Sequence, residues 1–238
     1  MTAPLSFESV ALGRLRRRTL APLETGEQAG DPGFTLAVEA GQVVGALGDE
    51  SSGVDSLGAV ILGLAQAPAG TCRVFGVELA RLDRRAQFAY RRRIGYLPAG
   101  DGLLHNLSLR DNIGLPLRFG SDYQLDQIET RIDQLLDRLR LRRVSGLRPA
   151  DANEEERRRA ALARALASLP ELMVLEEPFA GLTDRAAGDL FEIAREDSDG
   201  ARAHRTLFIT GQSLPATLRA RLDREVKVVR GQAVEEQT

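Results

Sequence analysis

The sequence predicts an α/β protein with a mostly parallel sheet. Four short runs, 43–48, 94–98, 172–175 and 207–210, are apolar almost throughout, and helical stretches separate them. Strands that are apolar on both faces and alternate with helices are typical of a parallel sheet covered by helices on each side. The chain has 238 residues, 43% of them hydrophobic, which is enough to build a sizeable core.

Charge and rare residue types exclude several classes of function. The chain carries 34 acidic and 32 basic side chains, and this balance argues against a nucleic-acid partner. Of the basic residues 31 are arginines and one is a lysine, Lys227, so no lysine-dependent phosphate loop or Schiff base can form in the first 226 residues. One cysteine (Cys72) and two histidines argue against a disulfide and against a Cys- or His-rich zinc site.

The N-terminal part is predicted to hold short strands and one helix. Residues 24–33 are rich in Gly, Pro and acidic residues and predict an exposed turn between two strands. The alternating run 34–38 is predicted to be the second of these two strands. The apolar run 43–48 follows and is predicted to be a buried strand. A Gly/Ser/Asp-rich loop leads to a predicted helix over 57–64, and 70–76 is predicted to be a further strand.

The remaining two thirds alternate between helices and strands. Residues 83–93 predict an arginine-rich helix before the strand 94–98, and 106–165 are predicted to be mostly helical, with apolar residues in 126–141 recurring every 3.6 positions. Strands follow at 172–175, 207–210 and 225–229, the last leading through a turn at 230–232 into a final strand. The N-terminus lacks the features of a signal peptide, and no apolar run approaches the roughly 20 residues of a membrane span, so we expect a cytoplasmic protein.

Five segments in this order resemble the ATP-binding subunit of ABC transporters. They are 41–48 (the strand into the P-loop), 92–98 (the strand before the glutamine loop), 111–118 (the helical subdomain), 157–166 (the helix after the signature motif) and 172–182 (the Walker B strand and its loop). The resemblance implies a P-loop NTPase fold with a RecA-like core in 1–100 and 166–238, N-terminal antiparallel strands and an inserted helical subdomain at 101–165. Residues 102–119 are also similar to ATPases of MCE-type lipid transporters.

The P-loop implied by this resemblance is degenerate. Such a loop needs glycines that let backbone N–H groups face phosphate, a lysine, and a hydroxyl for Mg²⁺. Here Val54 stands at the lysine position and Asp55 at the hydroxyl position, and the rest of the predicted loop is Gly48, Asp49, Glu50, Ser51, Ser52, Gly53 and Ser56. One pair of like charges about 4 Å apart repels by roughly 4 kcal/mol at an effective dielectric near 20. A helix dipole contributes only about 0.3–1 kcal/mol, so we predict that this loop does not bind nucleotide.

The other motif positions have also changed. Where the family has a signature serine and glycines, this chain has Asn153, Glu154 and Glu155, which predict a good helix N-cap and a poor phosphate contact. The glutamine-loop position falls on Ala99 or Gly100, and the switch-histidine position on Gly211 or Gln212. There is also no aromatic residue near Arg14 to stack on an adenine.

Two carboxylates remain at the Walker B position. Glu176 replaces the usual aspartate, and Glu177 matches the catalytic carboxylate, which we interpret as retained without catalysis. No metal site is expected. The weak candidates are Asp55 and Glu176, and the alternative is that these two converge with Asp49, Glu50 and Glu177 into a cation site.

Three arginine runs allow two interpretations. They begin at Arg14, Arg91 and Arg157. Contact with anionic lipid headgroups or with nucleic acid is one interpretation, and a solvated or salt-bridged helix face, which we favour, is the other. In the last run, Glu154, Glu155 and Glu156 precede the arginines at spacings that allow pairing along a helix.

The sequence therefore predicts an ABC-type pseudo-ATPase with a scaffolding or regulatory role. Its expected partners are a membrane permease, a second ABC-type ATPase subunit or a second copy of itself, which would place it on the cytoplasmic face of the membrane. No cofactor is expected. One alternative is an active ATPase with atypical motifs that uses ATP and Mg²⁺ to power transport, of lipid for example, and another is a soluble cation-sensing regulator.

Overall fold

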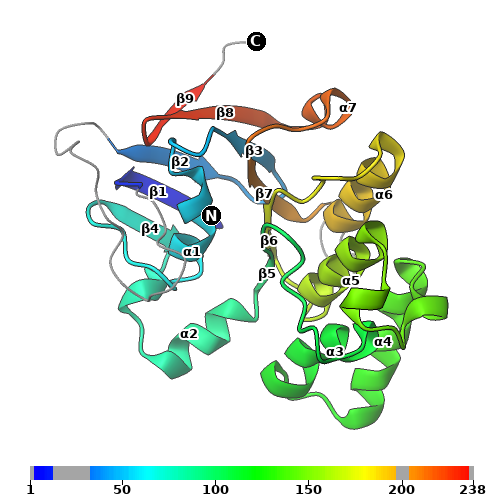
Figure 1. Ribbon diagram of the computed structural model, residues 1–238. Coiled ribbons are helices and arrows are strands. Elements are labelled where there is room, and N and C mark those ends of the chain that lie inside the picture. Colours follow the sequence, from blue (N-terminus) through cyan, green and yellow to red (C-terminus); the bar gives the residue numbers. More distant parts are fainter. Residues whose placement is uncertain (1–2, 13–32, 197–203, 236–238) are drawn as a thin grey trace.

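The computed structural model describes residues 3–12, 33–196 and 204–235. The predicted turn at 24–33 lies almost entirely outside these ranges, and the arginine run that begins at Arg14 lies wholly outside them. Nine strands and seven α-helices are found within the described ranges (Figure 1).

A six-stranded sheet forms the centre of the molecule. Its order is β5-β6-β7-β3-β8-β9, parallel from β5 to β8, with β9 antiparallel at the edge. The bounds are Ile94–Leu97 (β5), Leu172–Glu176 (β6), Thr206–Gly211 (β7), Val43–Leu47 (β3), Arg224–Val229 (β8) and Gln232–Glu235 (β9). The predicted mostly parallel sheet is confirmed.

A second sheet of three antiparallel strands, ordered β2-β1-β4, lies beside the first. It comprises Leu5–Val10 (β1), Phe34–Val38 (β2) and Thr71–Val74 (β4). The predicted N-terminal antiparallel strands are therefore confirmed. Phe7, Phe34 and Phe208 make ring contacts that join this sheet to β7 of the central one.

The central strands are apolar because both of their faces are covered. In β3, Val43 and Leu47 belong to one buried cluster, and Val44 and Ala46 belong to another on the opposite face. Successive side chains of a strand point to opposite faces, so a strand covered on both sides must be apolar throughout.

The helices fall into two groups. α1 (Leu57–Ile61), α2 (Arg84–Arg91) and α7 (Ala216–Arg219) are short, and α7 lies beside α6 (Asp184–Arg195), one of four longer helices that gather on one side of the molecule (Figure 1). The other three are α3 (Leu109–Gly120), α4 (Leu125–Arg138) and α5 (Glu154–Leu166). The helical character expected over 106–165 is confirmed, and the sequence also contained an unassigned signal for α6, whose buried residues Ala187, Leu190, Phe191 and Ala194 follow helical spacing.

The predicted helix over 57–64 is too long. α1 ends at Ile61, and Gly63 adopts a left-handed backbone conformation (φ 63°) that ends the helix. The helix after the P-loop position therefore has only five residues.

Arg205 is the largest fully buried side chain and lies just before β7. Its guanidinium donates hydrogen bonds to the carbonyl oxygens of Pro170, Ala194 and Glu196, each at 2.9 Å. Because Ala194 and Glu196 lie at the end of α6, Arg205 satisfies carbonyls that a helix C-terminus leaves without intrahelical partners. It thereby connects α6, β7 and the loop before β6.

No helix among the described residues is long and apolar enough to cross a membrane.

Candidate functional site

The loop that follows β3 is closed by its own hydrogen bonds. The Asp49 carboxylate accepts from the backbone N–H of Ser51 (2.8 Å) and from its hydroxyl (2.6 Å). The Ser52 hydroxyl donates to the Asp49 carbonyl (2.6 Å) and accepts from Val54 N–H (3.3 Å). Several N–H groups of the kind that would otherwise face a phosphate are therefore already occupied by protein oxygens.

These hydrogen bonds also keep the loop negatively charged. The Ser51 hydroxyl and N–H lower the pKa of Asp49 below its usual value, so this carboxylate stays ionised at neutral pH. An ionised carboxylate in the loop repels the α- and β-phosphates of a nucleotide, which carry no proton at neutral pH.

Val54, at the position of the P-loop lysine, points into the protein core. It is 5% exposed and belongs to the same buried cluster as Leu57, Val60 and Ile61. Gly53 before it has φ 79°, and a short 3-10 turn over Val54–Ser56 directs its side chain inward.

Five carboxylates line one cavity of about 470 Å³ at this end of the sheet, and none of the described residues that line it is basic. The lining residues are Gly48, Asp49, Glu50, Val54, Asp55, Ala99, Glu176, Glu177, Thr210, Gly211 and Gln212. The structure thus brings together Asp49, Glu50, Asp55, Glu176 and Glu177, which the sequence grouped only in the alternative of a cation site. The alternative of a cation site gains no support, since the part of the chain that the structure describes contains no group of three or more His, Cys, Asp or Glu arranged to hold a metal.

Glu176, at the end of β6, is largely buried and held in place by hydrogen bonds. The Tyr96 hydroxyl donates to Oε2 of Glu176 (2.8 Å), and Ala99 N–H donates to the same oxygen (3.3 Å). Its other oxygen, Oε1, lies against Gly58 of α1, where any larger residue would collide with it. Burial raises the pKa of Glu176, and the negative charge of Asp55 adds to the effect.

We expect Glu176→Gln to stabilise the fold at neutral pH. The pKa of Glu176 is higher in the folded protein than in the unfolded chain, so above the usual glutamate pKa the folded protein still holds this proton while the unfolded chain has lost it. The free energy of unfolding therefore falls as the pH rises from the unfolded pKa to the folded one. Glutamine keeps an acceptor for Tyr96 and removes the buried charge. Urea unfolding should show a gain on the order of 1 kcal/mol at neutral pH that disappears near pH 4, and Glu192→Gln, at an exposed position, serves as the matched control. A loss of stability at neutral pH would contradict this account of Glu176.

Glu177 forms a strained connection to the neighbouring strand. Its backbone has φ 43°, and its Oε1 accepts a hydrogen bond from Gln212 N–H (2.6 Å). Its carboxylate also lies about 3.0 Å from where a Cβ on Gly211 would be. The carboxylate at the catalytic position thus binds the backbone at the switch-histidine position.

The signature position forms a well-capped helix start. The Asn153 side chain accepts from Glu156 N–H (2.9 Å), and the Glu156 side chain accepts from Asn153 N–H (2.9 Å). This capping box confirms the predicted cap at Asn153. Glu154 packs against Gly181, and Glu155 forms an ion pair with Arg159 (2.8 Å).

Arg158 and Arg159 of α5 are buried and not solvated, but the predicted pairing with a preceding glutamate is confirmed for Arg159, which forms an ion pair with Glu155 four positions earlier. Arg158 and Arg159 are 5% and 6% exposed. Arg158 donates to the carbonyl of Gly100, and Arg157 forms an ion pair with Asp101 (3.2 Å) instead of with a preceding glutamate. Arg157 and Arg158 thus bind the loop after β5, whereas Arg159 pairs with Glu155 of its own helix and with Asp189 of α6.

A family model for ABC transporters matches residues 32–180, which is more than half of the chain. The chain belongs to the ABC transporter family. It is 34% identical over 163 residues to a probable ABC transporter ATP-binding protein of Azorhizobium caulinodans, covering 68% of this chain and 56% of that protein, so the chain spans little more than half of that relative's length. It is 29% identical to the lipopolysaccharide export system ATP-binding protein LptB of Escherichia coli, over 77% of this chain and 74% of LptB.

Solved structures support the same fold. A dimeric ATP-binding cassette in a post-hydrolysis state, bound to ADP and Pi, matches with a TM-score of 0.81 at 18% identity and covers 98% of each chain. An ATP-binding subunit of an ABC transporter matches with a TM-score of 0.76 at 22% identity, covering 98% of this chain and 89% of the other. At these identities the likeness concerns the fold alone.

One arrangement at the glutamine-loop position was not predicted from the sequence. Arg164, on the same helix as Arg158, donates to the carbonyl oxygens of Gly102 (2.8 Å) and Asp101 (3.4 Å). The loop at the glutamine-loop position is therefore attached to α5 by arginines and to β6 through Glu176. The only signal in the sequence was the arginine excess itself.

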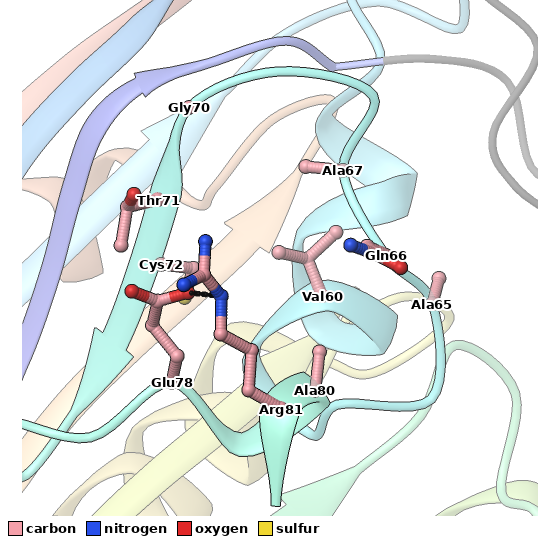
Figure 2. Close-up of a pocket in the computed structure, with 10 residues that line it drawn as sticks. All are labelled: Val60, Ala65, Gln66, Ala67, Gly70, Thr71, Cys72, Glu78, Ala80 and Arg81. Atoms are coloured by element: carbon pink, nitrogen blue, oxygen red, sulfur yellow. Dashed lines mark ion pairs between the residues drawn. The ribbon is translucent and has the colours of Figure 1, made fainter.

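A separate pocket between α1 and β4 is too small to serve as an active site in this family member. It measures about 50 Å³, room for one or two waters, and Figure 2 shows Cys72 within it beside the Arg81–Glu78 ion pair (2.5 Å). Burial raises the pKa of the Cys72 thiol to about 12, so this thiol is protonated and unreactive at neutral pH.

Proposed function

We propose that this chain is a pseudo-ATPase subunit of an ABC transporter. The observation that carries the proposal is the self-closed loop after β3, in which Asp49 occupies N–H and hydroxyl donors and Val54 is buried. The five carboxylates around the same cavity repel a nucleotide phosphate.

The proposed role is scaffolding or regulation within a transport complex. The relatives are named as ATP-binding proteins of transport systems, one for lipopolysaccharide export and others for methionine import. A permease, a second ABC-type subunit or a second copy of the chain is the proposed partner, on the cytoplasmic face of the membrane. The proposed division of the chain is a RecA-like core at 1–100 and 166–238 with helices at 101–165. A lipid cargo follows only from the similarity of 102–119 to MCE-type ATPases.

ATP binding tests the catalytic half of this proposal. Titration calorimetry of the full chain with ATP and Mg²⁺ should show no binding at micromolar concentrations, and Glu177→Gln should leave any background hydrolysis unchanged. Micromolar binding, with hydrolysis that Glu177→Gln abolishes, would instead establish the alternative of an active ATPase with ATP and Mg²⁺ as cofactors.

A groove between α2, β5, α3 and α5 is the proposed contact for the permease. It has a volume of about 440 Å³, and its rim exposes Phe88 (62%) and Phe119 (84%). Large exposed aromatic side chains at a hollow are typical of protein interfaces. Arg91, Arg92 and Arg164 add positive charge, and no acidic residue is among the described residues that line the groove.

We expect Phe119→Ser to weaken binding of the permease by about tenfold or more, because anchoring aromatic residues at interfaces contribute at least about 1–2 kcal/mol. The measurement is recovery of the chain with the membrane fraction, combined with a photo-crosslinker at position 88 and mass spectrometry of the product. Leu125→Ser is the matched control, since Leu125 is 70% exposed and lies outside the groove. Equal losses for both variants, or a crosslink to a protein without membrane spans, would contradict the assignment.

A further inference from the structure

A second cavity lies on the other side of the loop after β3. It measures about 580 Å³ and is lined by one face of β8, by α7 and by the loop that follows β7. In the sheet, Lys227 of β8 pairs with Leu47 of β3. Leu47 belongs to one core cluster and Val228 to the cluster that contains α1, so residues from both faces of the sheet line this cavity. It adjoins the first cavity, since Gly48, Asp49 and Gln212 line both.

The charges of the two cavities have opposite signs. Arg219 and Glu225 neutralise each other in an ion pair (Nε to Oε2 2.8 Å). Lys227 and Arg230 also line the cavity and are exposed, and neither forms an ion pair with any of the described residues. The one remaining anion is Asp49, which leaves a net charge of about +1, whereas the first cavity has five carboxylates and no basic residue among its described lining.

The turn after β8 brings the second cation to the cavity. Arg230 has a left-handed backbone (φ 49°) and Gly231 follows with φ 76°, which makes a tight hairpin into β9. Arg230 therefore lies three residues after Lys227 at the same mouth, together with the Ser213 hydroxyl.

We propose that this cavity is a binding site for a phosphate group, held between Lys227 and Arg230 with a hydrogen bond from Ser213. Two cations with no ion-pair partner among the described residues suit a dianion, and an arginine guanidinium matches the oxygens of phosphate in geometry. The only lysine of the chain thus provides a cation near the loop that lacks one, from the strand next to β3.

Asp49 gives the site selectivity for phosphate over sulfate. Phosphate keeps a proton at neutral pH and can donate a hydrogen bond to a carboxylate, whereas sulfate is fully ionised and only repels it. Oδ1 of Asp49 is bound to Ser51, and within the described residues Oδ2 accepts no hydrogen bond.

Calorimetry or NMR titration of the full chain with inorganic phosphate at low salt tests the site. We expect a dissociation constant of about 1 mM, raised about tenfold or more in the variant Lys227→Gln with Arg230→Gln. The control is Arg84→Gln with Arg85→Gln, which removes the same charge from exposed positions of α2 and, measured at the same salt concentration, should change affinity less than about twofold. Sulfate should bind about tenfold more weakly than phosphate, and Asp49→Asn should remove that difference.

Absence of phosphate binding at tens of millimolar, or equal weakening in both double variants, would overturn the proposal. Equal affinity for sulfate and phosphate in the wild type would overturn the role of Asp49. Micromolar ATP binding that is unaffected by the change at Lys227 and Arg230 would count against the pseudo-ATPase proposal and leave this one standing.

Discussion

Replacing Arg205 with methionine is expected to lower the free energy of unfolding by about 3–5 kcal/mol. Methionine preserves much of the aliphatic volume but removes the donors to Pro170, Ala194 and Glu196. Each buried carbonyl left without a partner costs about 1–3 kcal/mol, and the end of α6 loses its cap. For a chain of this size the melting temperature should fall by about 10 °C.

Chemical denaturation of the full chain measures the effect of this change. Arg221→Met is the matched control, because the Arg221 side chain is 44% exposed, pairs with Glu192 at the surface (2.5 Å) and otherwise lies over the ring of Phe191 (5.9 Å to the centroid). That control should change stability by no more than about 1 kcal/mol. If Arg205→Met also lowered the free energy of unfolding by no more than about 1 kcal/mol, water or other groups would have to satisfy the carbonyls of Pro170, Ala194 and Glu196.

Val54→Lys is expected to destabilise the protein by about 2–4 kcal/mol and to produce no ATP binding. The substitution restores the residue type of an ordinary P-loop but places an ammonium among Leu57, Val60 and Ile61. If the lysine turned outward instead, it would still meet the carboxylates of Asp49, Glu50 and Asp55.

Denaturation and ATP titration of this variant give independent measurements. Leu125→Lys provides the control, since Leu125 is 70% exposed on α4, where introducing a lysine should cost no more than about 0.5 kcal/mol. A Val54→Lys protein that is as stable as the wild type and binds ATP with Mg²⁺ would show that a single residue blocks nucleotide binding.

Much of the fold was predictable from the sequence because it depends on local periodicity. The apolar runs at 43–48, 172–175 and 207–210 became β3, β6 and β7 within one or two residues. Buried parallel strands need apolar residues at every position, and amphipathic helices need them at every third or fourth position. Both patterns can therefore be recognised in the amino-acid sequence alone. The length of α1 was wrong because a left-handed glycine ended the helix early.

The side-chain directions at the site could not be predicted in the same way. The carboxylates of Asp49, Asp55 and Glu176 converge because parallel strands end at one edge, which sequence reasoning can anticipate. The burial of Val54 depends on the direction of one 3-10 turn, and the burial of Arg158 and Arg205 depends on carbonyls contributed by distant loops. Arginine runs in a sequence indicate positive charge and do not reveal which members face solvent.

The position of Lys227 also makes the protein convenient for site-specific chemistry. It is the only lysine, it is exposed, and it lies at the mouth of the cavity beside the loop after β3. Cys72, the only thiol, stays protonated at neutral pH because burial raises its pKa to about 12. An amine-reactive fluorophore therefore modifies a single side chain without any engineered residue. Once the label on the α-amino group of the chain is removed or subtracted, its emission reports on what enters that end of the sheet.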